Sequence, residues 1–120
     1  MRLFVVCDGW DVVVVPFPFT DSPEAKRRPA VVLSARRFNQ SGHSVMCMVT
    51  TSRSARWPGD IELPLRESGA IGLPEQSIIR TMKIFTLDNR IILRKIGTLG
   101  EDLRDTALRL LHTHLWGLSP

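Results

Sequence analysis

The chain has 120 residues, a formal net charge of +4, and 43% hydrophobic and 23% charged residues, which predicts one globular domain over residues 1–120. No stretch approaches the roughly 18 apolar residues of a membrane span, and residues 1–7 are too short for a secretion signal, so we expect a cytoplasmic protein that does not enter a membrane. The basic excess favours a polyanionic partner such as RNA, or an acidic protein.

Two apolar runs, Val12–Val15 and Ala30–Leu33, predict the first two strands because β-branched residues fit a pleated surface. The first strand starts at Trp10-Asp11, and the second covers Arg28–Ala35. Neither run alternates apolar with polar residues, so both faces of each strand should be buried. The loop between them, residues 16–27, contains three prolines, which end the first strand because proline cannot donate a ladder hydrogen bond.

The middle of the chain alternates apolar runs with segments rich in turn-forming residues. The further predicted strands are His43–Ser52, Asp60–Leu63, Ser77–Leu87 and Ile91–Ile96. The turns and loops between them are residues 36–42, 53–59, 64–75 and 88–89.

The predicted helix is Glu101–Leu115, which has two acidic residues in its first turn and leucines at helical spacing, and which Gly117 ends. Five or six strands and one terminal helix predict a mostly β fold, a small barrel of mostly antiparallel strands with a C-terminal α-helix packed on it.

Cysteines and histidines give no sign of a metal site. Cys7 and Cys47 are expected to be free, buried thiols on strands. His112 and His114 are two residues apart and so do not share a helix face, and we expect His114 to be packed and His43 to lie in a turn or at the surface. Asp11 starts a strand beside a turn, although it could also position Arg28 or act as a base.

Six motifs in order carry a family resemblance that covers about residues 9–115. They are PFPFTD, KRRPAVVLS, MVTTSR, GDIEL, SIIRTMKIFTLD and RKIGTL. Together they resemble the MazF/PemK toxins of bacterial type II toxin–antitoxin systems. The resemblance implies an SH3-like barrel of the CcdB/MazF type, and a homodimer that cuts single-stranded RNA as an mRNA interferase without metal or another cofactor. It also implies a cognate antitoxin whose acidic, disordered tail occupies the RNA groove.

The resemblance carries the family's catalytic pair onto Arg28 and Thr50, with Thr51 as the neighbouring candidate. RNA supplies its own nucleophile, the 2′-OH, and cleavage would leave a 2′,3′-cyclic phosphate and a 5′-OH. Arginine donors match phosphate oxygens but cannot act readily as acid or base. We therefore expect Arg28 to stabilise charge in the transition state, and Thr50 to hydrogen-bond a phosphate oxygen or the 2′-OH.

Other residues are candidates for RNA binding, each beside a structural alternative. Phe17 and Phe19 could stack bases or plug the barrel end, Trp57 could do either, and Arg80 could instead form a structural ion pair. The full set of predicted RNA contacts is Phe17, Thr20, Lys26, Arg27, Thr51, Ser52, Arg53, Arg56, Gln76 and Arg80.

Two other functions stay open: a CcdB-like gyrase poison, and a non-catalytic barrel that binds RNA or an acidic peptide, since a fold does not fix its function. The chain departs from the family at Trp10, where many members have glycine before the aspartate. The fold should tolerate this large residue because Gly9 adjoins it, whereas the rim of the RNA site and the base preference should change.

Overall fold

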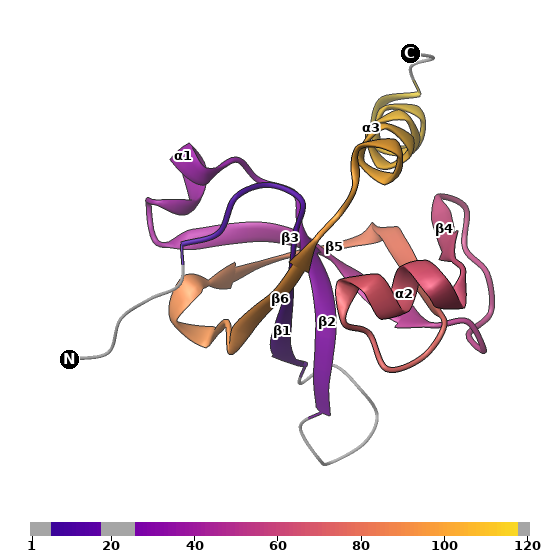
Figure 1. The fold of residues 1–120 in the computed structure, drawn as a ribbon. Helices are drawn as coiled ribbons and strands as arrows, with labels where there is room; N and C mark the ends of the chain where they lie inside the picture. The colour runs from indigo at the N-terminus through magenta and orange to yellow at the C-terminus, as the bar shows by residue number, and fades with distance from the viewer. Residues whose placement is uncertain (1–5, 18–25, 118–120) are drawn as a thin grey trace.

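A computed structural model describes residues 6–17 and 26–117 of the chain, and its core is a six-stranded sheet in the order β4-β5-β3-β2-β1-β6. All neighbouring strands are antiparallel, and the sheet curls into a half-barrel (Figure 1). The strands are β1 (Asp11–Phe17), β2 (Lys26–Val32), β3 (His43–Thr51), β4 (Asp60–Leu63), β5 (Ser77–Asp88) and β6 (Arg94–Thr98).

The central strands are buried on both faces, as their unbroken apolar runs predict. Val12, Val31 and Cys47 point into one core, which also holds residues of β4, β5 and the C-terminal helix. Val13 and Ala30, one residue along, point into a second core on the opposite face of the sheet. Side chains alternate across a strand, so one valine-rich stretch supplies both cores.

An irregularity in β5 divides this long strand into two halves. Met48 of β3 pairs with Arg80, whereas the preceding residue, Cys47, pairs with Ile84, so residues 81–83 bulge from the ladder. Such insertions bend a strand and increase its twist. The first half of β5 therefore pairs with β4 and with the end of β3, the second half pairs with the start of β3, and the sheet curls at this point.

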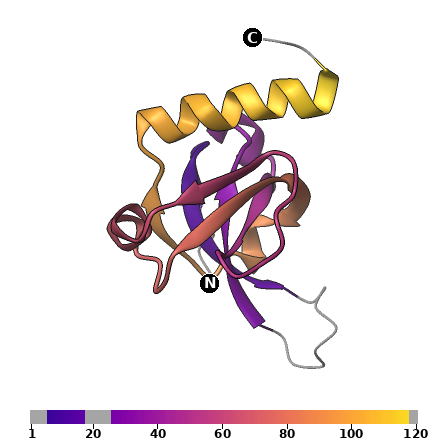
Figure 2. The ribbon, with the colours of Figure 1, turned by 90° about the vertical axis from the view of Figure 1, so that its right-hand side faces the viewer.

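Helix α3 (Glu101–Trp116) lies across one end of the half-barrel (Figure 2) and buries Ala107 and Leu111 in the first core. Helix α2 (Leu65–Ile71) approaches β6 at Gly97, where an added Cβ would lie 2.8 Å from the carbonyl oxygen of Ile71. This close approach fixes the position of the loop that follows α2. Within the described ranges, none of the helices has the length and apolar character that crossing a membrane requires.

Three of the predicted loops and one predicted strand were partly wrong. Residues 36–42 contain a one-turn helix, α1 (Arg36–Asn39), and residues 64–75 contain α2. The predicted strand Ile91–Ile96 is instead a 3₁₀ turn, η1 (Asn89–Ile91), followed by β6. In addition, β1 runs to Phe17, so Pro16 does not end it, and β2 begins at Lys26 and ends at Val32. Both strands therefore extend into the predicted loop 16–27.

Buried amides explain why the polar segment 36–42 is ordered. Asn39 is fully buried and its amide donates to the carbonyl oxygens of Cys7 (2.7 Å) and Ser34 (2.9 Å). Asn89 donates to the carbonyl of Asn39 (2.6 Å) and accepts from Ser44 (2.6 Å). These bonds satisfy buried polar groups and join α1 to η1, a connection that residue patterns do not reveal.

The cysteines are free and buried, as predicted, although Cys7 precedes β1 rather than lying on a strand. Burial raises the pKa of the Cys47 thiol to about 12. The pKa of Cys7 is also raised, first by burial and then by the charge of Asp11. Both thiols are therefore protonated at neutral pH, which makes them poor nucleophiles.

Trp10 adopts the left-handed backbone conformation, with φ of 74°. Its amide donates to the carbonyl of Val32 (2.6 Å) and its carbonyl accepts from Leu99 (2.9 Å), which holds the backbone in place. Its ring packs against the first core. The chain thus tolerates tryptophan here through packing and two backbone bonds, at a position whose conformation suits glycine.

We predict that the Trp10→Gly variant is more stable than Trp10→Ala by about 1 kcal/mol, because only glycine escapes the penalty of the left-handed region. Both variants lose the packing of the indole ring, so the difference between their free energies of unfolding reports the cost of the left-handed backbone conformation. Urea unfolding of the two variants measures it, and equal midpoints at equal slopes would contradict a backbone origin.

Candidate active site

The candidate site forms where β2 and β3 separate. β2 pairs with β1 from Lys26 to Val31, but with β3 only between Ala30 and Val32. Ala30 lies opposite Met48, so continuing that register by two residues places Arg28 opposite Thr50. Arg28 and Thr50 therefore belong to the same face of the two strands, at the end where the ladder has opened.

The opened end contains a cleft of about 590 Å³ and an adjoining cavity of about 150 Å³, and Arg28 and Thr50 line both. Arg28 and Thr50, the pair predicted from the sequence, thus lie at the same cleft on neighbouring strands. The cleft is lined by Lys26, Arg27, Arg28, Thr50, Thr51, Arg53, Ser54 and Glu75.

Arg28 is half-buried, and its Nε atom is buried with no acceptor among the described residues. A buried donor without a partner is costly, because the group loses its water and gains no hydrogen bond. Guanidinium donors match the geometry of phosphate and carboxylate oxygens. Arg28 is therefore suited to bind an anionic ligand in the cleft.

Thr50 and Thr51 both line the cleft, although side-chain alternation predicts that only one of them points into the site. The hydroxyl of Thr50 lies 2.9 Å from that of Ser54, and either can donate the hydrogen bond. Ser54 was not predicted from the sequence, yet it fixes the Thr50 hydroxyl. Thr50 is thus the threonine whose oxygen is held in position on the side of Arg28.

The predicted RNA contacts fall into three groups. Lys26, Arg27 and Arg53 are exposed at the cleft. Ser52, Arg56, Gln76 and Arg80 are absent from its lining. Phe17 ends β1, but its side chain, like Thr20 and Phe19, lies outside the described residues.

The Arg56 guanidinium is occupied by local contacts. It donates to the carbonyls of Ser52 and Ser54, both at 2.9 Å, and pairs with Glu62 at 2.9 Å. The backbone N–H of Ser52 donates to the carbonyl of Gln76 (3.1 Å). These bonds fix the 52–56 loop, which lines the cleft through Ser54.

Arg80 has the structural ion pair that is the alternative to RNA contact. Its side chain is 9% exposed and pairs with Asp60, whose side chain is 5% exposed, through two hydrogen bonds at 3.0 and 3.2 Å. The guanidinium also lies 4.4 Å from the ring centroid of Trp57. Trp57 therefore covers the ion pair with one face of its ring, although the residue stays 42% exposed.

Glu75 is a site residue that the sequence reasoning missed. Among the described residues that line the cleft it is the one carboxylate, and it pairs with Arg53 at 3.5 Å. The segment 64–75 reads as a loop of turn residues, and no pattern within it connects Glu75 to Arg28. The lining otherwise contains four cations, so the cleft is strongly positive and suits a polyanion.

Three other candidates lie elsewhere. Asp11 accepts from Asp8 and Thr98 and pairs with Lys95 at 3.2 Å, so it fixes the start of β1 and does not position Arg28. His114 is exposed, so the prediction of a packed histidine was wrong. Trp10 does not line the cleft, which leaves its predicted effect on the rim without support.

The fold and the cleft define a class of protein: a small β half-barrel with one C-terminal helix and a cationic cleft at its opened strands. Residues 8–115 match the family described as PemK-like, MazF-like toxin of type II toxin–antitoxin system. The chain belongs to this family.

Relatives of known structure or name agree with that assignment. The endoribonuclease toxin MazF of Escherichia coli (strain K12) is 33% identical over 72 residues, which are 59% of this chain and 65% of the relative. The chain thus matches just under two thirds of that relative's length. The crystal structure of MazE-MazF (Form-III) from Deinococcus radiodurans matches with TM-score 0.72 and 26% identity, over 96% of this chain and 100% of that chain.

A mycobacterial endoribonuclease in complex with its cognate antitoxin has the same fold, with TM-score 0.74 over 95% of this chain and 99% of that chain, at 15% identity. The predicted fold class, a mostly β barrel of the MazF type with a C-terminal helix, is confirmed.

We predict that Asp60→Asn destabilises the protein by about 3–5 kcal/mol, because it leaves the buried Arg80 guanidinium without its counter-charge. The matched control is Glu62→Gln, also on β4, which breaks the exposed pair with Arg56 and should cost less than about 1 kcal/mol. Chemical unfolding measures both, and similar losses for the two variants would contradict the assignment of Asp60–Arg80 as a buried structural pair.

Proposed function

We propose that this protein is an endoribonuclease toxin that cuts single-stranded RNA, with Arg28 and Thr50 as its catalytic residues. The observation that carries the proposal is that these two residues line one cationic cleft, and that the Arg28 Nε atom has no partner among the described residues. An RNA phosphate would supply the missing acceptor.

The reaction is an attack of the RNA 2′-oxygen on the adjacent phosphorus. The O2′–P bond forms, the P–O5′ bond breaks, and the products are a 2′,3′-cyclic phosphate and a 5′-OH. Negative charge grows on the non-bridging oxygens in the transition state, and fixed donors aimed at those oxygens lower the barrier. Arg28 performs this role because it is half-buried and held on a paired strand.

Thr50 positions the reacting group. Its hydroxyl is fixed by Ser54 (2.9 Å), so it can hold either the 2′-OH or a phosphate oxygen in line with the leaving oxygen. Ser54 acts through Thr50 and is a positioning residue.

The proton of the 2′-OH needs an acceptor. Arginine and lysine side chains offer no acceptor atom in their charged forms, and they make up half of the described lining. The carboxylate of Glu75 can accept a proton, so we assign it the role of general base. The leaving 5′-oxygen takes its proton from water at the open side of the cleft.

The comparisons support the proposal in part. The Escherichia coli relative is named an endoribonuclease toxin, and the Deinococcus radiodurans MazF was crystallised with MazE. We therefore propose a cognate antitoxin as partner. Its acidic segment would occupy the cleft that Lys26, Arg27, Arg28 and Arg53 make positive. The homodimer stays a prediction from the resemblance.

We predict that Arg28→Ala and Thr50→Val each slow cleavage of a long mRNA by about 10²–10³-fold, because each removes one donor to the transition state. The assay runs in EDTA, with product ends mapped for the 2′,3′-cyclic phosphate. The control is Arg109→Ala, which removes an exposed arginine on α3, outside the cleft.

Intact RNA with the wild-type protein, or undiminished cleavage by Arg28→Ala, would refute the assignment. A parallel arm measures DNA supercoiling by gyrase, and inhibition without loss of RNA would favour the gyrase poison instead.

We predict that Glu75→Gln lowers the rate of cleavage by about 10²–10⁴-fold, the range for loss of a general base. Binding of 2′-O-methyl RNA, which lacks the nucleophile, should not weaken, because glutamine removes a negative charge from a cationic cleft. A loss of binding parallel to the loss of rate would mean that Glu75 shapes the cleft and takes no proton.

A further inference from the structure

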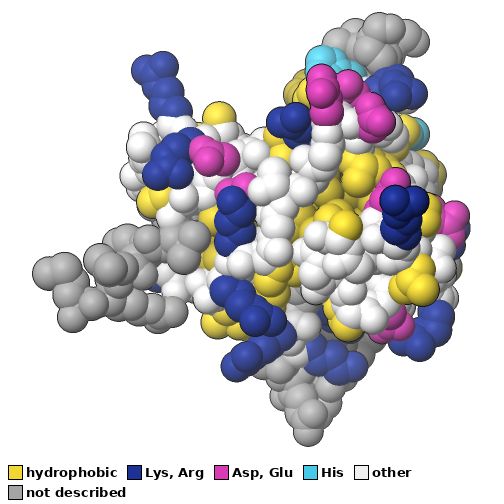
Figure 3. Space-filling model, viewed as in Figure 1, with side chains coloured by type: hydrophobic (Ala, Val, Ile, Leu, Met, Phe, Trp, Pro, Cys, Tyr) yellow, Lys and Arg dark blue, Asp and Glu magenta, His cyan; other side chains and the backbone are white. Residues whose placement is uncertain are grey.

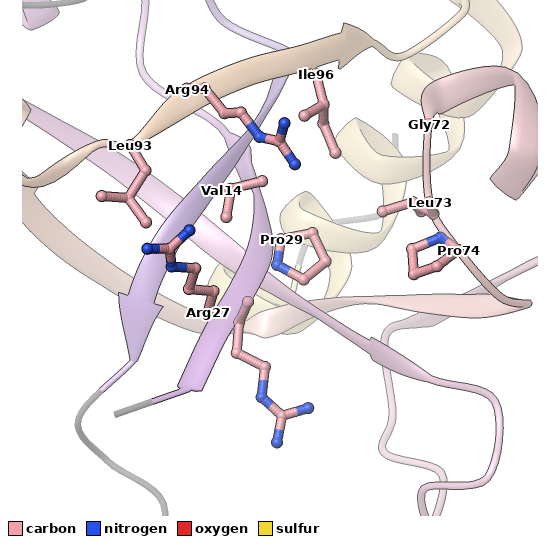
Figure 4. A pocket seen from close by; sticks show the side chains of 10 residues that line it. Val14, Arg27, Pro29, Gly72, Leu73, Pro74, Leu93, Arg94 and Ile96 are labelled. Atoms are coloured by element: carbon pink, nitrogen blue, oxygen red, sulfur yellow. The ribbon is translucent and has the colours of Figure 1, made fainter. Parts of the chain in front are cut away.

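A second groove adjoins the cleft on the other side of β2. It has a volume of about 540 Å³ and lies between β1, β2, β6 and the Gly72–Pro74 loop that follows α2 (Figure 4). Of the residues that line it, only Arg27 and Arg28 are site residues predicted from the sequence, because its other walls come from distant segments.

Two exposed arginines, Arg27 of β2 and Arg94 of β6, border this groove. Within the described part of the chain, neither guanidinium makes a hydrogen bond or ion pair, unlike those of Arg56 and Arg90. Figure 4 shows the Arg94 guanidinium extended over the groove between Val14 and Ile96. No acidic residue is among the described residues that line it.

The floor between the arginines is apolar. Val14, Pro29 and Ile96 form it, and Leu93 adds a side chain that is 40% exposed. In the space-filling view, Lys and Arg side chains gather at the lower centre beside an apolar patch (Figure 3). A positive rim over an apolar floor suits a ligand that carries a flat apolar surface and an anion in one unit, such as a nucleotide.

The groove is continuous with the candidate active site. Arg27, Arg28, Pro29, Leu73 and Pro74 line both the groove and the cavity that contains Thr50. A single strand that crosses the Arg28–Thr50 cleft therefore meets this groove next.

We propose that the groove binds the nucleotide that adjoins the scissile phosphate of single-stranded RNA. Arg94 and Arg27 contact its phosphate, and its base lies on the floor beside Leu93. This inference rests on the proposed function, since it extends the RNA path from the same cleft. Arg94 is thereby an RNA-binding residue, and Leu93 helps to decide which base stands beside the cut.

The test measures binding of single-stranded 2′-O-methyl RNA by fluorescence anisotropy, so that cleavage does not interfere. Arg94→Ala should weaken binding roughly tenfold, the effect of one lost charge-assisted hydrogen bond. It should also reduce the slope of log affinity against log salt by about 0.7, as expected for one phosphate contact on a single strand. Arg109→Ala is the charge-matched control and should change neither quantity.

Leu93→Ser is the second variant, and it tests the floor without changing charge. It should alter the base preference on one side of the mapped cleavage sites and leave the salt slope unchanged. Unchanged affinity and salt slope in Arg94→Ala, with both variants folded, would overturn the inference. So would a loss of binding to an acidic peptide in Arg94→Ala without a loss of RNA binding.

The two proposals fail separately. A wild-type protein that binds 2′-O-methyl RNA but leaves ordinary RNA intact refutes the nuclease activity. In that case, the affinity of Arg94→Ala for 2′-O-methyl RNA still tests whether the groove binds RNA. Cleavage that is normal in rate and base preference in both groove variants refutes the groove and leaves the nuclease standing.

Discussion

The separation of β2 from β3 is the constraint on which the rest of the site depends. β2 keeps its pairing with β1 down to Lys26, while its pairing with β3 ends at Ala30. The strand is therefore held rigidly on one edge and open on the other. Arg28 lies on this open stretch. No β3 residue is paired with it, while its pairing with β1 still fixes its backbone. A site built on a paired strand is positioned more precisely than one on a loop.

Ion pairing decides which arginines are available to a ligand. Arg80 is buried against Asp60, and Arg56 is held by Glu62 and two carbonyls, so both stabilise the frame around the site. Arg28 and Arg94 have no such partners among the described residues. The sequence alone does not distinguish the ion-paired arginines from those that have no partner. Only the positions of the carboxylates separate the structural arginines from those that face a ligand.

The sequence predicted the strands well because those signals are local, and the valine runs define β1 and β2. The family resemblance singled out Arg28 and Thr50, and the structure places both at one cleft, while their catalytic role stays a prediction. Sequence reasoning failed where order comes from distant partners. Asn39 folds the 36–39 turn into a helix through bonds to Cys7 and Asn89. Glu75 lies at the cleft because β5, which begins at Ser77, pairs that residue with Thr51 at the end of β3. The residue pattern within those two segments does not indicate either contact.

Exposure divides the cations of the site into two kinds. Arg27, Arg53 and Arg94 are exposed, so salt screens their attraction for a polyanion, and they act mainly on encounter and alignment of the strand. Arg28 is half-buried with a desolvated Nε, where interactions with charge are screened much less. In the proposed reaction, the charge that develops on the phosphate would therefore be stabilised chiefly by Arg28. The opened end of one strand provides both an accessible cationic surface and a poorly solvated donor, which are the two properties that the proposed binding and cleavage of a phosphodiester require.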